Sequence, residues 1–283
     1  MNFFLTQILL PFVISLLASA IVVFFGIRSL RDYINDRVLQ EQYGQLKEFW
    51  WSEGAGKRYV LIAGSEAGDE HSFEVEPRIG YSQSHSLTEV THVIEAVHNS
   101  QASIESLLLA RDGVIPSEIF INANVIIFGG ELVLEKFRQL SLDLEVPFYQ
   151  HNLDLQQRNL TRFGHGKVIE ELQSHVDFAS RRILSDFGTA TRILNPSNGK
   201  LIFLFNANYS VGLLASVLAT TQPGNFPSVS FNKSTLAQQL VVEVSNPDRN
   251  NLISKQHPII TRNWITFTIT GDQIREAIER ASH

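Results

Sequence analysis

An uncharged, apolar run at the N-terminus constrains the fold of this chain most. From Asn2 to Ile27 the sequence has no charged residue, and from Ile8 to Ile27 it is almost wholly apolar. About 20 such residues in a helix cross the roughly 30 Å hydrocarbon core of a bilayer. Transmembrane helices tolerate an interruption such as Pro11. We therefore expect one transmembrane helix at residues 1–28.

A secretory signal peptide is the competing interpretation of this run. Ala18-Ser19-Ala20 looks like a cleavage site, but the apolar run continues through Ile21–Phe25 and no basic residue precedes it. We therefore favour the anchor.

The basic residues around the run indicate its orientation. Arg28, Arg31 and Arg37 follow the run, and none comes before it. The positive-inside rule then places the large C-terminal part in the cytoplasm. We expect a single-pass protein of the cell inner membrane.

Residues 29–53 have the pattern of an amphipathic helical stalk. Leu30, Ile34 and Val38 recur at helical spacing among charged residues. Two arrangements stay open, packing on the protein's own domain and pairing with copies in a homo-oligomer. We expect the Trp50-Trp51 pair at a domain surface, because the stalk places it too far from the bilayer for an interfacial belt.

Composition excludes several classes of function. The 283-residue chain has 44% hydrophobic residues, enough for a large core, and a formal net charge of −6. Its soluble part has no long basic block, so we expect no nucleic-acid partner. The chain has no cysteine, which excludes disulfides, thiolate metal sites and cysteine nucleophiles and permits a reducing compartment.

Strand and helix patterns alternate in residues 57–160. The apolar runs 59–63 and 124–128 and the segment 147–149 are typical of strands. Ser86-Leu-Thr-Glu89 matches a capping box and predicts a helix start. Further helices are predicted at 104–110 and 131–144. This alternation predicts a parallel sheet.

Residues 161–283 continue the alternation. Strands are predicted at 201–205, 240–244 and 264–269, and helices at 211–220 and 272–282. Either two Rossmann-like halves, 57–160 and 161–283, or one sheet built from both would fit this order. The expected fold is α/β, with a Rossmann-like, mainly parallel sheet preceded by one transmembrane helix and a helical stalk.

Three strand-to-helix junctions are candidate ligand sites. In open parallel sheets, ligands bind beyond the carboxyl ends of the strands, where small residues and helix N-termini favour anionic groups. Three junctions in one chain favour a nucleotide-type small molecule as the ligand. The candidate ligand-binding residues are Gly64, Ser65, Glu66, Gly129, Gly130, Glu131, Asn206, Asn208, Tyr209 and Ser210.

No catalytic or metal site is predicted, and no cofactor. Glu66, Asp69, Glu70 and His71 form an acidic loop that could supply acid–base chemistry or bind a ribose diol, although a solvated loop is the more ordinary interpretation. Residues 164–167 lack the spacing of a phosphate-binding loop. The histidines are scattered, without metal-ligand spacing.

Part of the second half resembles a known group of domains. It contains Asp186-Phe-Gly188, then Asn195-Pro196, then the strand 199–204, and then an alanine, a tyrosine and a glycine before an Ala-containing helix. The strand that ends in Gly129-Gly130 adds to the likeness. These features resemble the STALD-like Rossmannoid domains of the SLOG superfamily. The resemblance implies a nucleotide-sensing cytoplasmic domain in prokaryotic antiphage defence, rather than a catalyst.

Three hypotheses follow for the whole chain. The first is a membrane-anchored sensor-effector that binds a nucleotide or NAD-derived signal and acts as a homo-oligomer. The second is a membrane-bound N-glycosidase or nucleotide hydrolase that uses Glu66, Asp69 or Glu131. The third is a protein-binding scaffold without a small ligand.

Overall fold

The computed structural model describes residues 43–64, 81–109, 114–129, 148–151, 159–164, 167–227, 236–248 and 250–283. One compact unit comprises Gln45–His283. The expected anchor, most of the expected stalk and the expected helix at 131–144 lie outside the described residues.

Within the part of the chain that the structure describes, none of the helices combines the length and the hydropathy needed to cross a bilayer.

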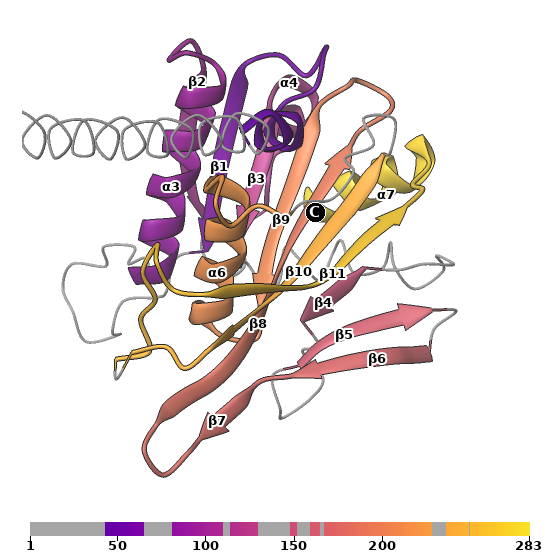
Figure 1. The fold of residues 1–283 in the computed structure, drawn as a ribbon. Coiled ribbons are helices and arrows are strands. Elements are labelled where there is room, and N and C mark those ends of the chain that lie inside the picture. The colour runs from indigo at the N-terminus through magenta and orange to yellow at the C-terminus, as the bar shows by residue number, and fades with distance from the viewer. Residues whose placement is uncertain are drawn as a thin grey trace, which may run out of the picture. The chain divides into compact units, whose positions relative to one another are not determined.

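One mixed sheet forms the centre of this unit, with the strand order β11-β10-β8-β9-β3-β1-β2 (Figure 1). Its parallel half contains β1 (Arg58–Gly64), β2 (Ser103–Leu109), β3 (Asn124–Phe128) and β9 (Leu201–Ala207). Its antiparallel half contains β8 (Arg182–Leu194), β10 (Ala237–Ser245) and β11 (Ile259–Phe267), and β7 (His175–Asp177) extends it by pairing with β8. The α/β class is confirmed, and four neighbouring strands of the sheet are parallel.

The two halves predicted from the sequence contribute to this one sheet. β3, from the first half, pairs in parallel with β9, from the second, with Val125 opposite Ile202 and Phe128 opposite Phe205. Both strands are buried along their length apart from the final residue of β9, as expected for central parallel strands. Of the two arrangements left open by the sequence, this pairing therefore agrees with one sheet built from both halves.

A second, antiparallel sheet lies beside the first and contains β4 (Tyr149–His151), β5 (Asn159–Gly164) and β6 (Lys167–Gln173). The strand predicted at 147–149 shares only Tyr149 with β4, and β4 belongs to this small sheet rather than to the parallel one. Gln239 of β10 fixes it there: its Oε1 accepts from the Tyr149 N–H at 2.6 Å, and its Nε2 donates to the Tyr149 carbonyl at 2.8 Å.

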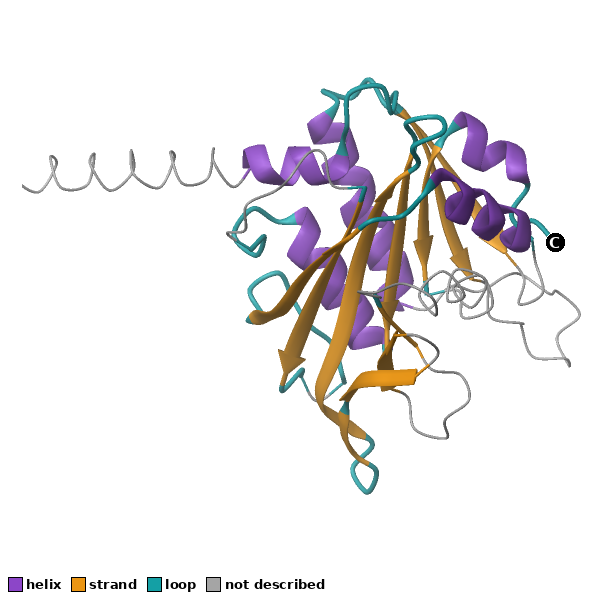
Figure 2. Ribbon diagram, turned by 90° about the vertical axis from the view of Figure 1, so that its right-hand side faces the viewer, coloured by secondary structure: helices purple, strands orange, loops and turns teal. Residues whose placement is uncertain are grey.

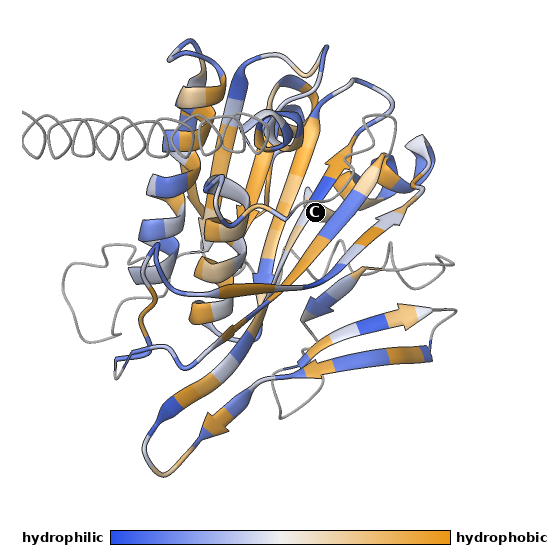
Figure 3. Cartoon of the chain, viewed as in Figure 1, coloured by the Kyte–Doolittle hydropathy of each residue, from blue (hydrophilic) through white to orange (hydrophobic). Residues whose placement is uncertain are grey.

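Helices cover both faces of the large sheet (Figures 1 and 2). α3 (Tyr81–Val97) and α6 (Ser210–Thr221) pack on one face, together with helical residues 45–50. α4 (Ser117–Asn122) and α7 (Gly271–Ala281) lie in the core cluster of the opposite face. β9 is hydrophobic over most of its length and turns hydrophilic toward one end (Figure 3), and its side chains contribute alternately to the two clusters.

The predicted helices at 211–220 and 272–282 are confirmed as α6 and α7. α6 is buried from Val211 to Thr221, which suits its uniformly apolar sequence. α7 is amphipathic, and Thr270 and Gln273 close a capping box at its start.

Two local predictions are wrong. The segment predicted as a helix at 104–110 forms the edge strand β2, in which Glu105 lies opposite Val60 and pairs with Arg58. The capping box at Ser86 does not start a helix, because α3 begins at Tyr81. Ser82, Ser86, Val90 and Ile94 form a buried stripe along α3, so Ser86 faces the core.

The expected surface position of the tryptophan pair is also wrong for Trp50. Phe49 and Trp50 are fully buried, and Trp50 packs against Phe203 and Phe205 of β9. The Arg192 Nε–H donates to the Phe49 carbonyl and the Tyr59 hydroxyl to the Trp50 carbonyl, both at 2.9 Å. The end of the stalk therefore packs on the protein's own domain.

Candidate functional site

Five strands of the large sheet, β1, β2, β3, β9 and β10, end at the same edge. β1 lies between β2 and β3, so the chain reverses its direction of strand addition at β1, which is the topological switch point of an open α/β sheet. β9 runs parallel to β3. β10 ends at this edge as well, since β10 and β9 are both antiparallel to β8. This edge is where an α/β sheet binds its ligands.

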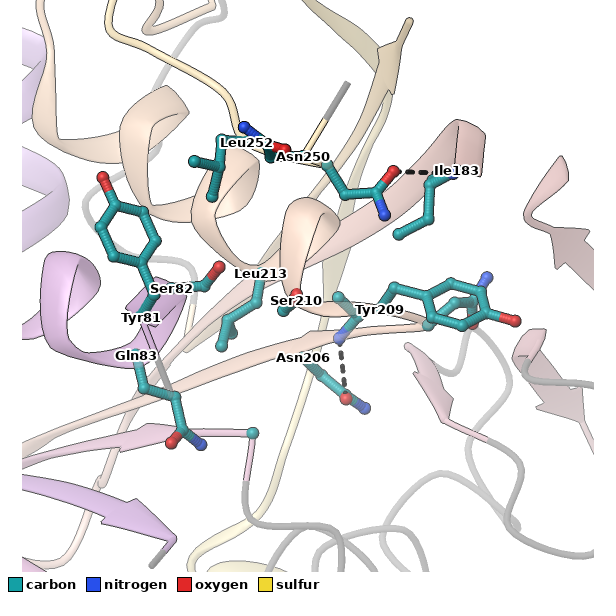
Figure 4. A pocket seen from close by; sticks show the side chains of 14 residues that line it. Tyr81, Ser82, Gln83, Ile183, Asn206, Tyr209, Ser210, Leu213, Asn250 and Leu252 are labelled. Atoms are coloured by element: carbon teal, nitrogen blue, oxygen red, sulfur yellow. Dashed lines mark hydrogen bonds between the residues drawn. The ribbon is translucent and has the colours of Figure 1, made fainter. Parts of the chain in front are cut away.

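A cavity of about 460 Å³ lies at this edge. Figure 4 shows Ser82 and Gln83 of α3 on one side of it and Asn206 and Ser210 of the β9–α6 junction on another. This volume lies within the range of about 300–1,000 Å³ typical of small-molecule sites. The lining residues are Tyr81, Ser82, Gln83, Gly129, Ile183, Asn206, Ala207, Asn208, Tyr209, Ser210, Leu213, Asn250, Asn251 and Leu252.

The structure brings together half of the ligand-binding residues predicted from the sequence. Gly129 at the end of β3 and Asn206, Asn208, Tyr209 and Ser210 after β9 line the cavity. Gly64 ends β1 at the same edge but is not among the lining residues. Ser65, Glu66, Gly130 and Glu131 lie outside the described residues, together with Asp69, Glu70 and His71.

Two lining segments were not predicted. Tyr81–Gln83 form the first turn of α3, which the misplaced capping box put outside the helix. Asn250–Leu252 follow β10. Asn246-Pro247, after the apolar run 240–244, marks a strand end comparable to the three predicted strand-to-helix junctions. Applying the strand-end rule to every strand would have found this second segment.

The cavity lining is polar but uncharged. Its polar side chains are carboxamides and hydroxyls, and none of its described residues is acidic, basic or a histidine. Across the residues that the structure describes, no three acidic or histidine side chains gather in a way that could hold a metal ion. Such a lining can orient a ligand by hydrogen bonds, and the phenols of Tyr81 and Tyr209 are the groups in its described part that could transfer a proton.

Carboxamides in the lining differ in how much of their hydrogen-bonding capacity the fold uses. Asn251 Oδ1 accepts from the Ile183 N–H at 2.9 Å, and its Nδ2 donates to the Arg181 carbonyl. Asn206 Oδ1 accepts from the Ala207 N–H at 2.8 Å. Asn208 donates through Nδ2 to the Leu172 carbonyl at 3.0 Å and to Ser174 Oγ at 2.8 Å, while its Oδ1 is buried without a partner among the described residues.

Asp186 lies behind the start of α6 and is fully buried. Its Oδ2 accepts from the Gly212 N–H at 2.6 Å, in the first turn of α6, and its Oδ1 accepts from Ser174 Oγ at 2.7 Å. Burial raises the pKa of Asp186 to about 7, against the opposing effect of these hydrogen bonds. The carboxyl group therefore already occupies the positive end of the α6 dipole.

The Asp186-Phe-Gly188 motif thus has a structural role. A Cβ at Gly188 would lie 1.9 Å from the Gly212 carbonyl oxygen, and a Cβ at Gly212 would lie 2.3 Å from the Phe187 carbonyl oxygen. Only glycine at both positions lets α6 approach β8 this closely. The motif sets the distance between β8 and α6, and Asp186 caps the helix there.

Comparison with known proteins leaves the chain without an assigned family. No protein-family model matches it, and neither the curated proteins nor the solved structures contain a match.

Proposed function

We propose that this protein binds a nucleotide-type small molecule in the cavity at the carboxyl ends of β3 and β9, and that it acts as a sensor. The cavity carries this proposal: it has the volume of a small-molecule site and lies at the edge of the sheet where α/β domains bind ligands. The resemblance of the second half to nucleotide-sensing Rossmannoid domains supports the same ligand class.

The start of α3 supports a phosphate-bearing ligand. Tyr81–Gln83 line the cavity, and the first turn of α3 has no acidic residue. The backbone N–H groups at a helix N-terminus attract anions. At the start of α6, by contrast, the Asp186 carboxyl group already accepts from the Gly212 N–H, where an anionic ligand would otherwise bind.

The described lining suits a sensor, because its amides and hydroxyls can hold a ligand by hydrogen bonds. α6 also connects the cavity with the end of the stalk: Ser210 lines the cavity, and the Thr220 carbonyl accepts a hydrogen bond from Trp50 Nε1. This contact gives ligand binding a direct route to the N-terminal segment.

The proposal extends to the apolar N-terminal run. We take this run as a membrane anchor that leaves the sensing domain in the cytoplasm, and copies of the chain as the components of a homo-oligomer that responds to the ligand. Prokaryotic antiphage defence is the setting that the resemblance implies.

The test is a ligand titration of the full-length protein in detergent, with cyclic nucleotides, ADP-ribose and NAD. We expect at least one of them to raise the melting temperature in proportion to the logarithm of its concentration above Kd. If none of these ligands shifts the melting temperature, the proposal is wrong.

A matched pair of variants locates the effect. Ser210 and Ser117 are both exposed first residues of helices, but only Ser210 lines the cavity. Ser210→Tyr should fill part of the cavity and abolish the shift, while Ser117→Tyr should leave it unchanged. Equal shifts in both variants would place the ligand elsewhere.

A further inference from the structure

Asn208 presents a hydrogen-bond acceptor that the described part of the fold does not use. It lines the cavity, its side chain is 2% exposed, and its Oδ1 has no partner among the described residues. A buried acceptor without a donor destabilises a protein. A ligand that donates a hydrogen bond here removes this cost when it binds.

Neighbouring groups fix the orientation of the Asn208 carboxamide. Its Nδ2 donates to the Leu172 carbonyl, which can only accept, so this end of the amide must be nitrogen. The same Nδ2 donates to Ser174 Oγ, and Ser174 in turn donates to Asp186. Oδ1 is therefore the end that remains for a ligand, and it demands an N–H or O–H donor. It is covered in the unliganded fold, so a donor reaches it only when neighbouring side chains shift.

The charges around Asn208 disfavour a phosphate at this position. Ser174 links Asn208 to Asp186, and no Lys, Arg or His is among the described lining residues. A phosphate here would meet the Asp186 carboxyl group without a cation to balance it. The neutral, hydrogen-bonding part of a ligand fits this end of the cavity.

We propose that the cavity recognises a nucleobase that carries an exocyclic amino group, and that this amino group donates to Asn208 Oδ1. This inference rests on the proposed nucleotide-binding function and assigns the base, rather than the phosphate, to the Asn208 end. Carboxamides are well suited to read such bases, because they match the donor and acceptor edges of the ring. The amides of Gln83 and Asn250 line the same cavity.

The experiment compares nucleosides that differ in the amino group. Isothermal titration of the full-length protein in detergent uses adenosine and guanosine against inosine, and cytidine against uridine, with inorganic pyrophosphate as a separate probe. At least one amino-bearing nucleoside should bind about tenfold or more tightly than its partner without the amino group, since a site that loses a required donor rejects the ligand strongly.

The variant Asn208→Ala should remove this discrimination and leave the two members of the pair bound equally. Asn225→Ala is the matched control, because Asn225 lies outside the cavity lining and its side chain bonds only to Gln222 among the described residues. The control should keep the discrimination of the unmodified protein. If Asn208→Ala does not fold, the nucleoside pairs on the unmodified protein still decide the question.

The outcomes separate this inference from the proposed function. Suppose that a nucleotide from the panel binds. Equal affinities within each nucleoside pair, or binding of pyrophosphate but of no nucleoside, would then overturn the recognition of the amino group. The proposed function would still stand. No binding by any nucleotide, nucleoside or pyrophosphate would overturn both.

Discussion

At the scale of single residues, the contact between Gly188 of β8 and Gly212 of α6 is among the tightest in the domain. A methyl group at Gly188 would lie 1.9 Å from the Gly212 carbonyl oxygen, and the backbone cannot yield there without moving α6. We expect Gly188→Ala to lower the free energy of unfolding by about 3 kcal/mol or more. Urea unfolding of the full-length protein in detergent measures this change.

Gly224 provides the control, because a Cβ there would meet no atom within 4 Å. Gly224→Ala should change the free energy of unfolding by no more than about 0.5 kcal/mol. Equal effects of the two substitutions would contradict the close approach of α6 to β8.

Asp186 makes the stability of the domain depend on pH. Burial raises its pKa from 3.8 to about 7 in the folded state. A carboxyl group with a raised folded pKa contributes stability that is fully present below about pH 4 and is lost as the pH rises through about 7. At about 1.4 kcal/mol per pH unit, the loss over this window reaches about 4 kcal/mol.

The comparison with Asp186→Asn isolates this contribution from other titrating groups. The difference in unfolding free energy between the two proteins should change steadily between about pH 4 and pH 7 and level off outside this window. Parallel pH profiles of the two proteins would show that Asp186 does not titrate there.

At the scale of elements, the end of the helix at residues 45–50 is held by the core. The Tyr59 hydroxyl donates to the Trp50 carbonyl and lies 2.9 Å from His98 Nε2. Tyr59→Phe leaves both groups without this partner and should lower the free energy of unfolding by about 1–3 kcal/mol. Tyr81→Phe, at a side chain that is 60% exposed, should have almost no effect on stability. Similar losses in both variants would contradict this role of Tyr59.

The sequence predicted those elements whose apolar pattern is long or continuous. β1, β3, β9 and α6 contain continuous apolar, mostly buried runs, and their lengths and flanking turn residues separate the short strands from the longer helix. β2 was missed because Ile104, Leu107 and Leu108 have helical spacing in a run too short to decide, and its pairing with β1 determined the outcome.

β8 shows a second limit of sequence patterns. An arginine is usually a surface residue, but Arg192, near the end of β8, is buried. Its Nε–H donates to the carbonyl of Phe49, which lies 143 positions away in the sequence.

The candidate site could be predicted only in part, for a related reason. The strand-end rule located Gly129 and Asn206–Ser210, because it depends only on where apolar runs stop. This rule gives no information on which polar side chains use their hydrogen-bonding groups within the fold and which keep them for a ligand. Asn251 Oδ1 accepts a hydrogen bond from Ile183, whereas Asn208 Oδ1 has no partner among the described residues. This difference depends on contacts between segments that are distant in the sequence.

At the scale of the whole molecule, the apolar N-terminal run should hold the protein in the membrane. We expect the full-length chain to stay in the membrane pellet after alkaline carbonate extraction. Leu16→Arg combined with Val22→Arg adds about 2.5–3.5 kcal/mol per residue to the cost of insertion and should release the protein. Leu16→Val combined with Val22→Leu is the control and should remain in the pellet. Release of the unmodified protein would contradict the anchor.

Hydrogen–deuterium exchange with a bound nucleotide tests the central claim most directly. The account predicts that the tightest-binding nucleotide of the panel slows exchange at the segments that line the cavity, 81–83, 206–213 and 250–252, and not at β6, which lies in the other sheet. Protection of β6 without protection of the cavity segments would contradict it.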